Sequence, residues 1–308
     1  MNKSKAYAKE HQGQATSITL FLMTGKGYEF LNQIAKKYKI LIDLIVVGND
    51  KSLQKDFEEE IIMLCVKEEI NFVKRKDFRE VKSEYAIAVS WRWLIDHPSE
   101  KLIVFHDSLL PRYRGFAPLT NALINGEEEI GVSAIFGATD FDTGDIIFQS
   151  KSKVTYPITI FEAIQSNQKN YLNCAESILN RLLRGETLKG IKQIEGDASY
   201  SIWRDENDYG IDWSKSSRDI KRFVDAVGYP YLGALTNING RRARIFGSDV
   251  YPDVYIENRH FGKVLFLREG KPVVICGKGL LMITEGKFEE NEENEPLLPL
   301  SNFRVRFS

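Results

Sequence analysis

The sequence contains few of the residues that form disulfides or metal sites. Its three cysteines lie far apart among apolar neighbours: Cys65, Cys174 and Cys276. Isolated thiols of this kind are typical of buried side chains in a reducing compartment, not of a disulfide framework. The four histidines are also scattered, and no pair has the spacing of metal ligands. We therefore expect neither disulfides nor a metal site.

Strong charge of one sign and long apolar runs are also absent. The formal net charge is −1, so no overall positive field favours binding to nucleic acid or to an acidic membrane. Residues 1–16 are polar and lack the apolar core of a secretory signal or a membrane span. We interpret residues 1–16 as a polar N-terminal extension, and we expect a cytoplasmic protein without a membrane segment.

Short apolar runs alternate with helical patterns over the first part of the chain. The runs lie at residues 18–23, 41–47, 70–73, 85–90, 101–105, 130–137 and 145–150. Helices are expected to about Tyr38, over about residues 53–69, and from Thr159 to about Leu183. Strands that alternate with helices are typical of βαβ units. The sequence therefore predicts an α/β fold, with a Rossmann-like, mostly parallel sheet flanked by helices, over residues 17–185.

The last third of the chain has a different pattern. Residues 186–210 are largely polar and are interpreted as a linker. Ser214 is a suitable N-cap for a short helix that ends near Val227. From Tyr231 onward, short alternating runs are broken by glycine-containing turns. This pattern predicts a smaller β-rich domain over residues 211–308, of about the size of an open barrel.

Two motifs indicate chemistry rather than packing. His106 follows the apolar run at 101–105 and opens a loop with proline and glycine, and Asp142 begins an Asp-Thr-Gly-Asp turn. Ligands of open α/β sheets bind beyond the carboxyl ends of the strands, which is where His106 is expected. A carboxylate beside a histidine holds the charge of the imidazole and can pass a proton through water. We therefore predict that His106 and Asp142 form a catalytic pair.

A third motif, Gly25-Lys26-Gly27, follows the first predicted strand and begins like a dinucleotide-binding pattern. The third glycine is missing, and no acidic residue clearly ends the second strand. A lone Gly-x-Gly is weak evidence, so we do not expect a dinucleotide at this position.

The two chemical motifs together resemble a known family. His-x-Ser-Leu-Leu-Pro-x-x-Arg-Gly at 106–115, followed by Asp-Thr-Gly-Asp at 142–145, is similar to the formyltransferases that use 10-formyltetrahydrofolate. These include methionyl-tRNA formyltransferase and the nucleotide-sugar N-formyltransferases. Landmarks of the C-terminal domain of the family match residues 211–214 and 229–234, so the resemblance runs from about Ser17 to Arg306.

The resemblance implies an enzyme, with 10-formyltetrahydrofolate as co-substrate and specific roles for several residues. His106 and Asp142 would be catalytic, and a primary amine would attack the formyl carbon. A protonated His106 would stabilise the oxyanion and help to expel the folate nitrogen, while Asp142 would keep His106 charged and accept the amine proton. The implied cofactor-binding residues are Ser90, Arg92, Trp93, Leu94, Ser108, Leu109, Thr139, Asp140 and Phe141.

One position departs from the pattern of the family. The third catalytic residue of the family is an asparagine two places before the histidine, and this chain has Val104 there. Residues two apart on a strand point to the same side, so Val104 would project beside His106 without a hydrogen-bond donor. Loss of one oxyanion donor typically lowers the rate about 10²–10³-fold. Three outcomes follow: a reduced rate, a substitute donor such as Asn121, or a domain that binds folate with little activity.

The acceptor amine is the remaining question. A tRNA formyltransferase is expected to carry a basic loop after the second strand, and residues 48–60 are instead short and acidic on balance. A small cluster at Arg241, Arg242 and Arg244 suits a diphosphate better than an RNA stem. We therefore expect a small-molecule acceptor, an amino sugar on a nucleotide, and keep methionyl-tRNA as the alternative. Trp203, Arg204 and Tyr229 are candidate acceptor-binding residues, and the sequence leaves the oligomeric state open, a homodimer included.

Overall fold

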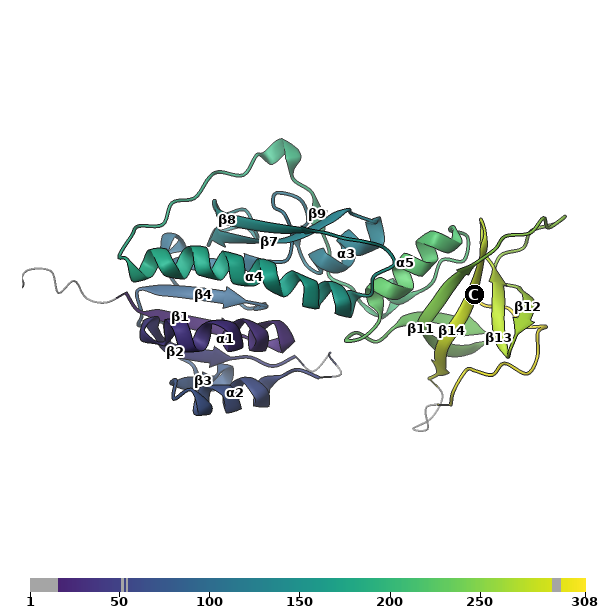
Figure 1. The fold of residues 1–308 in the computed structure, drawn as a ribbon, viewed down its shortest axis with the longest axis horizontal. Helices are drawn as coiled ribbons and strands as arrows, with labels where there is room; N and C mark the ends of the chain where they lie inside the picture. The colour runs from purple at the N-terminus through teal and green to yellow at the C-terminus, as the bar shows by residue number, and fades with distance from the viewer. Residues whose placement is uncertain (1–15, 51–52, 54, 290–294) are drawn as a thin grey trace, which may run out of the picture.

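The computed structural model describes residues 16–50, 53, 55–289 and 295–308. Within these residues, two large sheets form separate parts of the molecule (Figure 1). Most of the predicted extension at 1–16 lies outside the described residues. None of the helices described is both long and apolar enough to cross a membrane.

The first sheet is mixed and mostly parallel, as predicted. It has seven strands: β1 (Ile18–Leu22), β2 (Ile42–Val47), β3 (Phe72–Lys74), β4 (Tyr85–Val89), β5 (Leu102–His106), β7 (Glu129–Phe136) and β8 (Ile146–Lys153). Their order is β3-β2-β1-β4-β5-β7-β8. The first five are parallel, whereas β7 is antiparallel to both β5 and β8. The chain leaves β1 toward β2 on one side and reaches β4 on the other, which creates a crevice at the carboxyl ends of β1 and β4.

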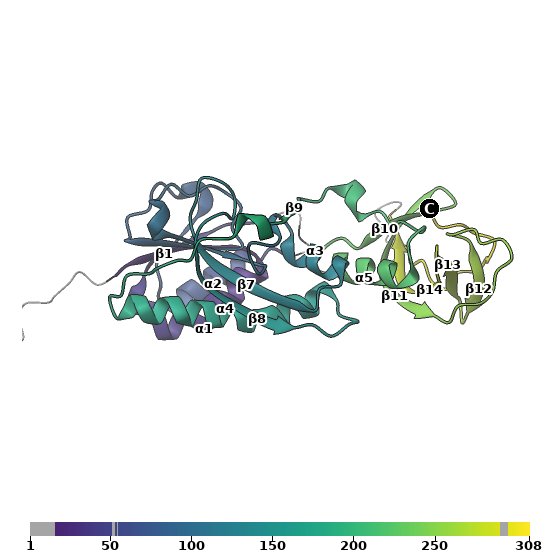
Figure 2. The ribbon, with the colours of Figure 1, turned by 90° about the horizontal axis from the view of Figure 1, so that it is seen from above.

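Helices cover one face of this sheet. α1 (Thr24–Tyr38), α2 (Glu58–Lys67) and α4 (Ile160–Leu183) share one hydrophobic core with the strands. Figure 2 shows α1 and α4 on the same side of the sheet. On the opposite face, Phe78 and Trp91 pack edge-on against Phe21, with ring centroids 5.2 and 5.1 Å away. Because that face is covered by loops rather than helices, it can open into a cavity.

The helix predicted over residues 53–69 is shorter than expected. It begins at Glu58, because Phe57 has a left-handed backbone with φ of 65° that cannot continue a helix. The side chain of Asp56 accepts a hydrogen bond from the Glu58 amide at 3.1 Å. A turn at Asp56 and Phe57 therefore precedes the helix, and the charged composition of the segment gave no sign of it.

The predicted linker at 186–210 contacts the N-terminal part of the molecule at several points. Ile191 forms a bridge with Ile146 of β8. Further along, β9 (Tyr200–Ser201) pairs in parallel with β6 (Arg114–Gly115), which lies in the loop after His106. This segment therefore contributes side chains beside the predicted catalytic pair. The loop after His106 continues beyond β6 into α3 (Pro118–Asn125).

The second sheet is antiparallel. Its strands are β10 (Ala234–Ile238), β11 (Arg241–Tyr251), β12 (Val264–Arg268), β13 (Lys271–Ile275) and β14 (Leu280–Phe288), in the order β10-β11-β14-β13-β12. Near the C-terminus, Phe307 bridges to Ile238 and Arg306 to Lys263, so the last residues partly close the sheet. Trp213 is buried in its core and donates its indole N–H to Thr236 Oγ1 at 3.0 Å. This arrangement agrees with the predicted open-barrel-like fold.

The cysteines are buried, as expected from their apolar surroundings. Burial raises the pKa of each thiol to about 12. Such thiols stay protonated and are inert at neutral pH. Among the described residues, no group of three histidine, cysteine or acidic side chains is arranged to hold a metal.

The short helix of the C-terminal part, α5 (Ser217–Val227), corrects one prediction. Its N-cap is Ser216, whose hydroxyl accepts from the Asp219 amide at 3.2 Å. Ser214 instead lies in a turn in which Asp212 accepts its amide at 3.0 Å. Asp212 is itself a strong turn former, and it holds Ser214 two residues before the helix can begin.

The two serines give a direct test of this correction. Ser216→Ala should lower the free energy of unfolding by about 1 kcal/mol, because the first turn of α5 loses its cap. Ser214→Ala, the control, should have less than half that effect. Urea unfolding followed by tryptophan fluorescence measures both, and equal losses would contradict the assignment of the cap.

Candidate active site

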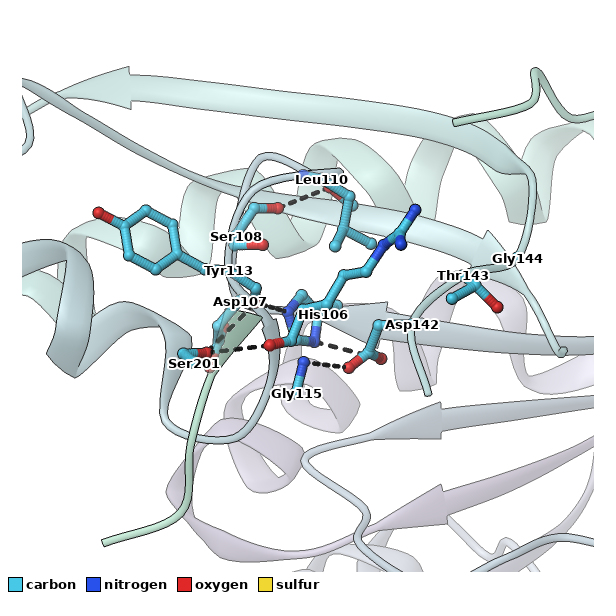
Figure 3. A network of polar contacts seen from close by, with 12 residues as sticks. His106, Asp107, Ser108, Leu110, Tyr113, Gly115, Asp142, Thr143, Gly144 and Ser201 are labelled. Atoms are coloured by element: carbon cyan, nitrogen blue, oxygen red, sulfur yellow. Dashed lines mark hydrogen bonds and ion pairs between the residues drawn. The ribbon is translucent and has the colours of Figure 1, made fainter. Parts of the chain in front are cut away.

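His106 is anchored at the end of β5 by its backbone position and by a carbonyl. Phe105 turns toward the helices, where its ring stacks on Tyr171 with centroids 6.0 Å apart. Val104 and His106 therefore face the opposite, loop-covered side of the sheet. The imidazole is 8% exposed, and its Nε2 donates to the Tyr113 carbonyl at 2.7 Å (Figure 3).

Asp142 completes the pair that the sequence predicted. Its Oδ1 lies 3.4 Å from Nδ1 of His106, and its Oδ2 accepts the Gly115 amide at 2.8 Å (Figure 3). Both ring nitrogens of His106 thus face acceptors. A carbonyl cannot donate, so the proton of this hydrogen bond lies on Nε2 of His106. The bond orients the ring so that Nδ1 faces the Asp142 carboxylate.

The glycines of both motifs are required by close backbone approach. A Cβ on Gly144 would lie 1.8 Å from the Phe136 carbonyl oxygen. Gly115 has φ of 97°, and a Cβ there would lie 2.5 Å from the Ser201 carbonyl oxygen. Asp142 itself has a left-handed backbone, with φ of 59°, which aspartate tolerates better than most residues. These constraints hold the carboxylate against the imidazole.

Gln193, from the segment predicted as a linker, clamps the Asp142 turn. Its amide nitrogen donates to the carbonyls of Asp142 at 2.7 Å and Gly144 at 2.8 Å. Its amide oxygen accepts from Nε of Arg114 at 3.1 Å, and the buried Arg114 also pairs with Glu195 at 2.9 Å. Sequence reasoning missed Gln193 because nothing in the local sequence marks it. Only the folded path of the chain brings it to the turn.

A cavity of about 440 Å³, the His106 cavity, opens at the carboxyl ends of β1, β4 and β5. Val104, His106 and Asp142 line it together. Four of its non-glycine lining residues, Thr24, Ser90, Ala117 and Asp142, have a positive φ. Non-glycine residues in this conformation are uncommon and cluster at functional sites, because the surrounding structure must hold them there.

The structure brings most of the predicted cofactor-binding residues to this cavity. Those that line it are Ser90, Arg92, Trp93, Leu94, Asp140 and Phe141. Leu94 is 90% exposed and lies at the rim. Thr139 is not among the lining residues. Ser108 and Leu109 line a different cavity of about 430 Å³, and the Ser108 hydroxyl is committed to the Arg112 carbonyl at 2.7 Å.

Two tryptophans form one wall of the His106 cavity. Trp91 and Trp93 meet edge-on with centroids 5.0 Å apart, and the Arg75 guanidinium lies 3.9 Å from the centre of the Trp93 ring. The indole nitrogen of Trp91 is buried, and no described residue accepts from it. A buried donor without a partner is costly to the fold.

A buried ion pair lies next to His106. The Lys26 ammonium contacts Oδ2 of Asp107, and Tyr171 donates to Oδ1 of Asp107 at 2.6 Å. Burial alone would lower the pKa of Lys26, but the adjacent Asp107 outweighs it and raises the pKa. Burial and Asp107 also raise the pKa of Tyr171 well above its ordinary value. The sequence analysis did not identify this ion pair. Lys26 appeared there only within the weak Gly25-Lys26-Gly27 pattern, and Asp107 only as the unspecified residue after His106 in the first motif.

Asn121 does not supply the donor that Val104 lacks. Its amide nitrogen donates to the Ala117 carbonyl at 2.9 Å, and its oxygen accepts from Arg204 at 2.8 Å. It does not line the His106 cavity. The prediction that Asn121 replaces the missing donor is therefore wrong, because α3 directs this side chain toward its own backbone and toward Arg204.

The remaining acceptor predictions are divided by the structure. Tyr229 lines a third cavity of about 450 Å³ beside the start of α1, here called the α1 cavity. Trp203 is exposed and, like Arg204, lines neither this cavity nor the His106 cavity. The expected diphosphate cluster is already paired with acidic side chains: Arg241 with Glu295, and Arg242 and Arg244 with Glu206 and Glu289. These ion pairs compete with any phosphate, so the expectation that the arginines hold a diphosphate is not supported.

Comparison with known proteins decides the family. The model described as formyl transferase matches residues 67–171, and the model of the formyl transferase C-terminal domain matches residues 204–297. The chain belongs to the formyl transferase family. Methionyl-tRNA formyltransferase of Fusobacterium nucleatum is 27% identical to this formyl transferase, over 71% of each chain. The enzyme of the same name from Syntrophomonas wolfei is 29% identical, over 84% of this chain and 81% of its own.

Solved structures agree with this assignment. An N-formyltransferase from Helicobacter canadensis, in complex with folinic acid and dTDP-3-aminofucose, has a TM-score of 0.66 at 18% identity. It covers 87% of this chain and 99% of its own. WlaRD, a sugar 3N-formyl transferase, has a TM-score of 0.64 at 20% identity, covering 91% and 100%. At these identities the likeness establishes that this formyl transferase shares their fold.

The clamp on the Asp142 turn can be tested without an activity assay. Gln193→Ala should leave two carbonyls and the Nε–H of Arg114 without a partner, lowering the free energy of unfolding by about 1–3 kcal/mol, while Arg114 keeps its ion pair with Glu195. The Gly115 amide, which donates to Asp142, should also exchange its hydrogen faster. Lys192→Ala, at the exposed neighbouring residue, is the control. Unchanged exchange at Gly115 in Gln193→Ala would show that the turn holds Asp142 without the clamp.

Proposed function

We propose that this formyl transferase moves a formyl group from 10-formyltetrahydrofolate to the primary amine of an amino sugar linked to a nucleotide. The observation that carries the proposal is that two cavities adjoin at Lys26, whose ion-pair partner Asp107 directly follows His106. The His106 cavity and the α1 cavity share Thr24 and Lys26 as lining residues. A donor in the first cavity and an acceptor in the second would therefore meet close to His106.

The His106 cavity is suited to the folate. Its aromatic wall, formed by Trp91, Trp93 and Phe141, can pack against a flat bicyclic ring. The Helicobacter canadensis protein, which shares the fold, was solved with folinic acid. These features support 10-formyltetrahydrofolate as the co-substrate.

We assign distinct tasks to the two nitrogens of His106. Nε2 is anchored on the Tyr113 carbonyl, so Nδ1 is the atom available for proton transfer. As the amine forms its bond to the formyl carbon, Asp142 accepts the surplus amine proton through a water. Nδ1 of His106 gives a proton to the folate nitrogen as the old carbon–nitrogen bond breaks. The proton on Asp142 then returns to Nδ1 across the 3.4 Å contact, which restores the pair.

The α1 cavity has the chemistry of a nucleotide site. Phe57, Phe161 and Tyr229 line it, and the rings of Phe161 and Tyr229 lie 5.3 Å apart. Such rings can stack on a base. Lys26 and Lys55 also line the cavity beside the start of α1, and Glu29 lines it with them. Lys26 pairs with Asp107, and Lys55 pairs with Glu60 at 2.7 Å, so a bound phosphate would share each lysine with a carboxylate. Positive side chains at a helix N-terminus favour a diphosphate.

A tRNA acceptor is the second candidate. The sequence relatives named methionyl-tRNA formyltransferase favour it. RNA affinity depends on neutralised phosphates. Residues 48–60 instead carry two lysines against five acidic residues, and the arginines of β11 are paired with glutamates. The charge distribution therefore favours the smaller acceptor.

The roles proposed for His106 and Asp142 predict how the variant Asp142→Asn changes kcat. Asp142→Asn keeps an oxygen that can accept the Gly115 amide but cannot stabilise an imidazolium or accept a proton. We expect kcat for formyl transfer to fall by about 10²–10⁴-fold, with folate affinity within threefold of the unmodified protein. Asp145→Asn, at the other end of the motif, is the control. A variant Asp142→Asn with undiminished kcat would remove Asp142 from the mechanism.

The α1 cavity predicts a selective effect on acceptor binding. Tyr229→Ala should raise KM for the amino sugar nucleotide by about tenfold, because loss of a stacked ring costs about 1–3 kcal/mol. Folate affinity should not change, because Tyr229 does not line the His106 cavity. The exposed Tyr255, which lines neither cavity, gives the control Tyr255→Ala. An unchanged KM in Tyr229→Ala would place the acceptor elsewhere.

A further inference from the structure

Lys26 occupies an unfavourable position for a structural lysine. It lies in the first turn of α1, where the positive end of the helix dipole repels a cation. Its side chain is only 16% exposed, and removal of an ammonium from water is costly. The Asp107 partner offsets part of this cost, but buried ion pairs are seldom a net source of stability. A buried lysine retained in such a place is therefore a candidate for function.

The same lysine borders the place where the reaction would occur. It lines the His106 cavity together with Val104 and His106. Its partner Asp107 directly follows His106, so the ammonium lies at the carboxyl end of β5. The two other cations that line this cavity have different positions: His106 is held between Tyr113 and Asp142, and Arg92 is 46% exposed and pairs with Asp50.

Lys26 can supply the hydrogen-bond donor that Val104 lacks. Valine offers no donor for the oxygen on which negative charge develops when the amine attacks the formyl carbon. An ammonium has three N–H donors, of which Asp107 accepts one. We propose that Lys26 donates a hydrogen bond to the formyl oxygen and stabilises its charge in the transition state, in place of a side-chain amide at position 104.

The balance of the step is simple. The lysine keeps its proton: as the new carbon–nitrogen bond forms, the carbonyl electron pair moves to oxygen and is stabilised by the ammonium. The pair then returns as the bond to the folate nitrogen breaks. Asp107 and Tyr171 fix the ammonium without taking part, so they are positioning residues. This inference rests on the proposed function, because it needs a formyl group in the His106 cavity.

A double-mutant cycle tests the inference. Lys26→Met should lower kcat about 10²–10³-fold, with KM for the acceptor changed less than threefold. Val104→Asn alone should change kcat less than threefold, because a donor is already present. Added to Lys26→Met, Val104→Asn should restore kcat at least tenfold. Lys36→Met, at an exposed position of α1, is the control.

Two results would overturn it. One is a Lys26→Met kcat that is unchanged or that Val104→Asn does not rescue. The other is a loss confined to KM, which would assign Lys26 to binding of the acceptor phosphates. Because Lys26→Met leaves Asp107 with an unpaired charge, the cycle is repeated with Asp107→Asn in every variant, including the Lys26-containing reference. Rescue must appear in that set if Lys26→Met alone does not fold.

A spectroscopic measurement separates this inference from the proposed function. The stable analogue 10-formyl-5,8-dideazafolate carries the same formyl group, and its carbonyl stretch can be isolated by ¹³C labelling. In the bound state the stretch should move to lower frequency, and Lys26→Met should reverse the shift. If the protein formylates no amine but the shift and its reversal are seen, the proposed function fails and the Lys26 contact stands. A stretch that is insensitive to Lys26 overturns the contact, whatever the turnover.

Discussion

The contact between His106 and Asp142 is the interaction on which this site depends. The two residues are 36 positions apart, and they meet because the Asp142 turn folds back over the end of β5. The turn can do so only with glycine at position 144, where any Cβ would collide with the Phe136 carbonyl. The Gly115 amide then fixes one carboxylate oxygen and leaves the other for the imidazole. A single carboxylate thus links both motifs.

The surroundings of this contact explain how two reactants could be brought together. The switch in strand order between β1 and β4 opens the crevice, and loops rather than helices cover that face of the sheet. Two cavities adjoin there, separated by the first turn of α1. The buried Lys26–Asp107 pair occupies this partition. Charge is therefore concentrated where the donor and the acceptor would meet, and the burial of the Lys26–Asp107 pair strengthens its electrostatic interaction.

The sequence predicted the parts of this structure that depend on local pattern. Apolar runs that alternate with helical patterns identified the parallel sheet. The two motifs identified His106 and Asp142, because together they resemble the pattern of a known family. The N-cap at Ser216 was missed by two residues, since Asp212 forms a competing turn. Gln193, Lys26 and Tyr171 were missed for a different reason. Their roles come from contacts between distant segments, which no local pattern records.

The surface arginines show the converse error. Arg241, Arg242 and Arg244 looked like a phosphate site in the sequence, but the fold pairs them with glutamates from two other segments. The α1 cavity instead has lysines that can bind the diphosphate and aromatic rings that can stack on the base. The sequence had suggested the arginine cluster for the diphosphate. The same class of acceptor is thus supported by different residues. A tRNA acceptor would need a larger and more positively charged surface than a sugar nucleotide.

A competition between acceptors tests the central claim most directly. The protein is mixed with 10-formyltetrahydrofolate labelled with ¹³C in the formyl group, a panel of dTDP-linked amino sugars and charged initiator tRNA. Carbon NMR and mass spectrometry then identify the nitrogen that receives the label. The account predicts that the label appears on the amine of a sugar nucleotide. Label on the methionyl group of the tRNA, or label that remains on the folate with every amine, would contradict it.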